Sequence, residues 1–104
     1  TKQNFMLRTT GDLVALCGVS RDDPNAAAAI HFCHGYYVGI DHFAELTGRP
    51  FRNVLYCPPE GLKLTRDEVL GMLVGWHRRN PQFAAEAPVE GVYRWASATW
   101  PCKK

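Results

Sequence analysis

The 104-residue sequence has no long apolar run and no strong excess of charge of either sign. Without a stretch of about 18 apolar residues, we expect no membrane-spanning helix. Twelve basic residues against ten acidic ones give a net charge of +2, and they are scattered along the chain. Phosphate backbones bind concentrated basic surfaces, so this distribution argues against nucleic acid as the main partner.

Motifs for common reactions are also lacking. The chain contains no glycine-rich phosphate loop, no GxSxG turn and no HExxH helix. Its cysteines form no close CxxC pair, which a four-cysteine zinc site usually needs. An even number of dispersed cysteines in a small chain instead favours two disulfides formed in an oxidising compartment. These cysteines are Cys17, Cys33, Cys57 and Cys102.

Four cysteines allow three disulfide pairings, and the sequence favours one of them only slightly. In that pairing, Cys17 with Cys33 would join the first two helices, and Cys57 with Cys102 would tie the middle loop to the C-terminal part. In the loop-entropy model these bonds contribute about 3 and about 4 kcal/mol, which is comparable to the stability of a small domain. The alternative is four reduced core cysteines in a cytosolic protein.

The length and a hydrophobic content of 46% suffice for one core. Residues 1–9 show no clear period and are expected to form an N-terminal arm. Residues 10–104 are then a single helical domain. The chain begins at Thr1 rather than Met, so we expect a processed chain from which a signal peptide has been removed.

The longest predicted helix covers residues 25–47, and the rest of the chain is organised around it. At about 100° per residue, its apolar side chains share one broad face and its histidines lie on the opposite one. Gly35 and Gly39 lie one turn apart and leave a bare notch that another helix backbone can approach closely. The expected core face consists of Ala26, Ala29, Cys33, Tyr36, Tyr37, Ile40, Phe43 and Ala44.

Three further helices follow from capping residues and periodicity. Cap-type residues at 9–12 precede a short helix, and a capping box of Thr65 with Glu68 opens a longer one that ends before Pro81. The last helix begins at Pro88 and leaves Trp95 outside its buried stripe. That stripe is expected to contain Val89, Val92, Tyr93, Ala96 and Trp100. The sequence therefore predicts an all-α fold, a small four-helix domain stapled by two disulfides.

Catalytic and metal sites are not expected. His31 and His34 could reach one metal ion from adjacent turns, but His42 lies about 12 Å from His34 along the helix, so the histidines cannot surround a single ion. Cys33 and His34 point about 100° apart, and Cys33 faces the apolar side. The acidic residues at 67–68 suit the start of a helix. We predict no cofactor and no enzymatic activity.

Five short segments, in order, cover almost the whole chain from Thr10. They are GDLVALC at 11–17, FCHGYYVGI at 32–40, CPPEGLKLTRDEVLGML at 57–73, HRRNPQ at 77–82 and ATWPC at 98–102. This series resembles the Rap/Tai-type immunity proteins. The resemblance implies a small helical fold with disulfides, located in the periplasm and often dimeric. It also implies protection against a cell-wall amidase toxin of type VI secretion, by occupation of the cleft that cleaves peptidoglycan.

On this basis we expect a rigid inhibitor that presents a loop to its toxin. Arginine and tyrosine are favoured at such contacts because they combine large area with directed hydrogen bonds. A first rival is a stand-alone periplasmic structural or chaperone-like module without an amidase target. A second is an enzyme or metal carrier built on His31 and His34. The candidate partner contacts are Arg49, Arg52, Asn53 and Tyr56, with Arg78 and Arg79 as a second patch.

Overall fold

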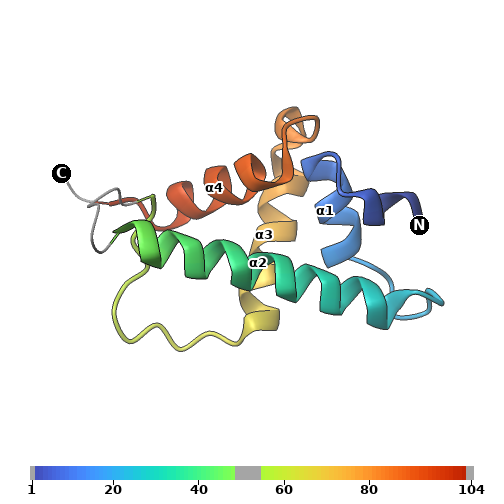
Figure 1. Ribbon diagram of the computed structural model, residues 1–104, viewed down its shortest axis with the longest axis horizontal. Coiled ribbons are helices and arrows are strands. Elements are labelled where there is room, and N and C mark those ends of the chain that lie inside the picture. Colours follow the sequence, from blue (N-terminus) through green and yellow to red (C-terminus); the bar gives the residue numbers. More distant parts are fainter. Residues whose placement is uncertain (1, 49–54, 103–104) are drawn as a thin grey trace.

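Helices make up most of the part of the chain that the computed structural model describes, which is residues 2–48 and 55–102 (Figure 1). In order, they are the 3-10 helix η1 (Lys2–Met6), α1 (Thr10–Cys17), α2 (Ala26–Gly48), α3 (Arg66–Arg79), the 3-10 helix η2 (Pro81–Phe83) and α4 (Pro88–Thr99). No strand occurs within these two described ranges. The predicted all-α fold with four α-helices and two disulfides is confirmed.

The long helix α2 sets the length of the molecule. Its 23 residues span about 34 Å at a rise of about 1.5 Å per residue. In Figure 1, α2 runs along the horizontal axis, α4 lies obliquely above it and α3 crosses its direction steeply. The much shorter α1 lies near the N-terminal half of α2. The short α1 packs closely against each of the other three α-helices.

All four α-helices contribute side chains to one core. The ring of Trp95 lies at its centre, with edge-to-face contacts to Tyr37 at 6.0 Å and to Trp100 at 5.3 Å between ring centroids. Burying aromatic rings in this geometry supplies both apolar area and specific packing. The largest fully buried side chains are Thr10, Leu13 and Leu16 of α1, Cys33 of α2, Leu73 of α3, and Val92 and Trp95 of α4.

The buried side of α4 differs from the prediction at three positions. Val89 and Tyr93, expected in the core, are 49% and 46% exposed. Trp95, expected outside it, is only 1% exposed. The other three residues of the predicted stripe are buried as expected. Relative to the predicted orientation, α4 is therefore rotated about its axis so that the side with Gly91 and Trp95 faces the core.

A close approach between Gly91 and Thr10 explains this rotation. A Cβ atom added at Gly91 would collide with the Oγ1 and Cγ2 atoms of Thr10, so only glycine allows α4 to lie this near the start of α1. The Thr10 hydroxyl donates to the carbonyl oxygens of Glu86 and Ala87 at 3.1 and 3.0 Å. Its backbone N–H also donates to Glu86, at 2.7 Å. This junction fixes which face of α4 meets the core.

Capping boxes begin both α1 and α3. The predicted box at Thr65 is confirmed: its hydroxyl accepts from the Glu68 amide, and the Glu68 carboxylate accepts from the Thr65 amide. Thr9 and Asp12 form a second box at the start of α1, where the sequence predicts only cap-type residues. Each box satisfies amide groups that the first turn of a helix leaves without partners.

The N-terminal residues before α1 are held against the domain. The Asn4 side chain donates to the Asp12 carboxylate at 2.9 Å, and the Arg8 amide donates to the same carboxylate at 2.9 Å. The ring of Phe5 meets Phe32 of α2 edge to face at 5.7 Å between centroids. The expected arm therefore contains the short helix η1, which contacts both α1 and α2.

The expected core face of α2 is confirmed for six of its eight residues, but not for Ala26, which is half-buried and not packed against the core cluster, or for Phe43. Ala29 and Cys33 are buried, and the aromatic and aliphatic residues that follow pack partly against the core. Phe43, however, is 63% exposed, so its predicted burial was wrong. Ile40 and Ala44 occupy the core side of that turn, and Phe43 lies outside it. Gly35 and Gly39 are bare: nothing in the described chain lies within 4 Å of a Cβ atom added at either position.

Candidate functional site

Two disulfides fix the scaffold, in the pairing that the sequence slightly favoured. Cys17, the last residue of α1, is bonded to Cys33 in α2, with their Cα atoms 5.2 Å apart. Cys57 is bonded to Cys102, with a Cα separation of 5.0 Å. The Cys57 amide also donates to the Trp100 carbonyl at 2.8 Å. The segment that follows α2 is thereby tied to the end of α4.

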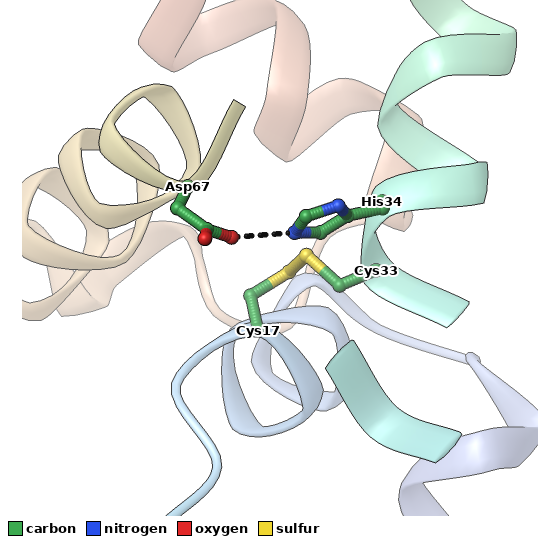
Figure 2. The surroundings of a disulfide bond; sticks show 4 residues. All are labelled: Cys17, Cys33, His34 and Asp67. Carbon is green, nitrogen blue, oxygen red and sulfur yellow. Dashed lines mark hydrogen bonds and ion pairs between the residues drawn. A yellow bond between two sulfur atoms is a disulfide. The ribbon is translucent and has the colours of Figure 1, made fainter. Parts of the chain in front are cut away.

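An ion pair lies beside the first disulfide (Figure 2). The Nε2 atom of His34 on α2 is 2.9 Å from the Oδ1 atom of Asp67 in the first turn of α3. The His34 side chain is 25% exposed and that of Asp67 is 81% exposed. Because the pair is largely open to water, its Coulomb energy is small, and its main effect is to align α2 with the start of α3.

A pocket of about 370 Å³ opens next to this pair. The disulfide, Ile30 and Leu70 supply apolar lining, while Arg21, His34 and Asp67 supply polar groups. The His34–Asp67 contact could not be predicted from the sequence, because the two residues are 33 positions apart. The sequence predicts only a helix-capping role for Asp67, whereas Glu68 forms the capping box.

The histidine face of α2 does not assemble a metal site in the structure. Within residues 2–48 and 55–102, no three or more His, Cys, Asp or Glu side chains are grouped to hold an ion. His31 and His42 are exposed, and His34 is engaged with Asp67. In the same two ranges, no helix has both the length and the apolar character needed to cross a lipid bilayer.

The predicted partner contacts lie in three different settings. Arg49, Arg52 and Asn53 lie outside the described residues. Tyr56 is 7% exposed, and its hydroxyl donates to the Asp41 carboxylate on α2 at 3.1 Å. Burial, together with the nearby charge of Asp41, raises the pKa of Tyr56. This tyrosine therefore anchors the segment after α2 to the core and has little surface to offer a partner.

Arg78 and Arg79 are both exposed at the C-terminal end of α3. Their charges suit the negative end of the helix dipole. Asn80 ends the helix, and its side-chain amide donates to the Trp76 carbonyl at 2.7 Å. The Arg78 guanidinium lies close to Gly18 at the end of α1, where it is 2.9 Å from the position that a Cβ atom would take. Arg79 lies on a different side of the helix, near Gly75.

Comparison with known proteins places this disulfide-stapled helical domain in a family. No curated protein and no solved structure gave a match. A sequence profile of the Rap1a immunity proteins does match, over residues 9–102, which includes all four α-helices and all four bonded cysteines. The resemblance inferred from the sequence motifs is therefore confirmed. The chain belongs to the family of Rap1a immunity proteins.

Proposed function

We propose that this protein is a periplasmic immunity protein that binds a secreted peptidoglycan amidase and blocks its active-site cleft. Membership of the family supports an inhibitor of a cognate effector toxin rather than an enzyme, and it is the observation on which the proposal chiefly rests. The two disulfides support an extracytoplasmic location, because such bonds persist in oxidising compartments. Delivery of the toxin by type VI secretion is part of the same proposal.

The proposed inhibition depends on a rigid backbone in the free inhibitor. A binder whose backbone is already fixed loses less conformational freedom when it meets its target. The segment between α2 and α3 is held to the domain at two adjacent residues: Tyr56 is buried, and Cys57 is bonded to Cys102. We propose that this segment contacts the amidase through Arg49, Arg52 and Asn53. Arg78 and Arg79 are proposed as the second contact patch.

An inhibition assay tests the proposal. The oxidised protein is mixed with a panel of peptidoglycan amidases, including the product of any neighbouring gene, and cleavage of purified peptidoglycan is followed. We expect stoichiometric inhibition of one amidase and none of the others. A sample that has been reduced and thiol-blocked serves as the control and should lose inhibition. If no amidase in the panel is inhibited, the stand-alone structural or chaperone-like module becomes the better account.

A homodimer is part of the proposal, and the bare face of α2 is the place we assign to it. A shallow apolar pocket there is lined by Gly35, Tyr36, Gly39, Ile40, Phe43 and Val89. Two copies of α2 crossing near the glycines would bury the same patch on each subunit, as twofold symmetry requires. Sedimentation should then show a dimer that Gly39→Leu converts to a monomer. A monomer in the unmodified protein would remove this part of the proposal.

A further inference from the structure

A cluster of three aromatic rings and an arginine lies on the surface where α3, η2 and α4 meet. We call it the aromatic corner: Trp76, Phe83, Tyr93 and Arg94. These residues line a pocket of about 360 Å³ together with Asn80, Gln82, Ser97 and Ala98. The pocket lies outside the sites described above and contains none of the predicted partner contacts.

Contacts within the chain hold the aromatic corner rigid. The rings of Trp76 and Phe83 are stacked, with centroids 5.8 Å apart and planes 10° from parallel. The Arg94 guanidinium lies 4.2 Å from the centroid of Phe83, over the ring. Through Nε and Nη2, it also donates to both carboxylate oxygens of Glu86, at 2.5 and 2.7 Å. The Glu86 carbonyl is in turn held by Thr10, so the arginine is anchored to the start of α1.

The exposed groups of this corner have the chemistry of a protein-binding hot spot. Trp, Tyr and Arg are the residues most enriched at such points, and a preorganised arginine loses less side-chain entropy on binding. Tyr93 is 46% exposed, the Arg94 side chain is 43% exposed, and the pair with Glu86 does not use Nη1. Arg79 lies about one turn after Trp76 on α3 and adds positive charge that Glu86 does not neutralise.

From these features we propose that the aromatic corner binds a projecting loop of the toxin, a loop with an apolar side chain next to an acidic one. The apolar side chain enters the pocket beside Trp76 and Tyr93, and the carboxylate meets Arg79 and the Nη1 atom of Arg94. A flat ligand, such as a sugar ring or a base, needs an open ring face, whereas Phe83 already packs against Trp76 and Arg94. This inference rests on the proposed function and extends its second contact patch from Arg79 to the aromatic corner.

Two exposed substitutions with matched controls test the inference. Tyr93→Ala alters the corner and Arg79→Glu alters the charge beside it, while Met6→Ala and Arg21→Glu make comparable changes at exposed positions elsewhere on the surface. The probe is the amidase of the panel that the unmodified protein inhibits. We expect each corner substitution to raise Kd by about tenfold or more, and each control to change it less than about threefold. Hydrogen exchange in the complex should show added protection at residues 79–98.

The possible outcomes separate this inference from the proposed function. If the unmodified protein inhibits no amidase in the panel, the proposed function fails, and this inference fails with it. If it inhibits one, but the Tyr93 and Arg79 variants bind as tightly as the unmodified protein, the inference alone is wrong. Absence of protection at residues 79–98 in a formed complex would also overturn it. That readout uses the unmodified protein, so a folding defect in a variant cannot obscure it.

Discussion

At the scale of single residues, glycines decide how close two helices can come. Gly91 allows α4 to lie against Thr10, whereas Gly35 and Gly39 face open space in the described chain. The same residue type therefore has opposite consequences at these sites. In the first it is required for packing, and in the others it weakens a helix without any packing gain in the single chain.

Alanine substitutions should make this contrast measurable. Gly35→Ala should raise the free energy of unfolding by about 0.5–1 kcal/mol, because alanine is the better helix former and its methyl group meets nothing. Gly91→Ala should lower it by about 2 kcal/mol or more, since the methyl group overlaps Thr10. Urea unfolding of monomeric samples measures both changes. Equal effects at the two positions would contradict the role assigned to Gly91.

The half-buried Tyr37 and the buried Tyr56 predict a loss of stability at alkaline pH. Burial, with a smaller contribution from Asp41, raises the pKa of Tyr37 from 10.0 to about 12, and the pKa of Tyr56 is also raised. Above pH 10 the unfolded chain ionises its tyrosines while the folded chain keeps these two protonated. The contribution of these tyrosines to the free energy of unfolding should therefore be constant just below pH 10 and be lost between pH 10 and pH 12. A pH series of urea unfolding curves measures it, and a flat profile would contradict the burial of these hydroxyl groups.

At the scale of helices, local signals in the sequence are sufficient to predict where a helix begins and ends, but not which of its faces is buried. The Thr65 capping box and Pro81 placed α3 closely, because both act within one turn. The phase of α4 was wrong because it depends on contact with Thr10, and no window of sequence around Trp95 contains that residue. The pair of His34 with Asp67 was missed for the same reason: it forms only after two helices have packed.

The two capping boxes should respond differently to substitution. Thr65→Ala removes the cap of α3 alone and should lower the free energy of unfolding by about 1 kcal/mol. Asp12→Ala removes the partner of Asn4 and of the Arg8 amide as well as a cap. It should therefore also loosen η1, which hydrogen exchange at residues 2–8 detects. Unchanged exchange there would show that η1 is held by its other contacts, such as the ring contact of Phe5 with Phe32.

At the scale of the whole molecule, the disulfides join parts of the chain that would otherwise pack independently. The sequence could indicate that two bonds form, but it favoured their pairing only slightly, because pairing depends on how the helices meet. The proposed contacts at Arg49, Arg52 and Asn53 stay predictions. The aromatic corner was not predicted either, because its four residues come from three separate elements.

Removing either disulfide should bring the protein close to unfolding. In the loop-entropy model, loss of the Cys17–Cys33 bond costs about 3 kcal/mol and loss of the Cys57–Cys102 bond about 4 kcal/mol. Thermal melting of the two double-alanine variants measures this. We expect a large drop in Tm for both, and the Cys33 change adds a cavity because that side chain is 1% exposed. Melting temperatures within about 3 °C of the unmodified protein would contradict this account.

The junction of Thr10 with Glu86 and Gly91 also bears on how such a chain reaches its compartment. An eight-residue helix such as α1 is not stable alone, and the amides of Thr10 and Gly11 in its first turn donate to the carbonyls of Glu86 and Ala84, in the segment before α4. These bonds can form only after that segment has been synthesised. A nascent chain with this dependence keeps its first helix open for longer, which suits the passage of an unfolded polypeptide that the proposed periplasmic location requires.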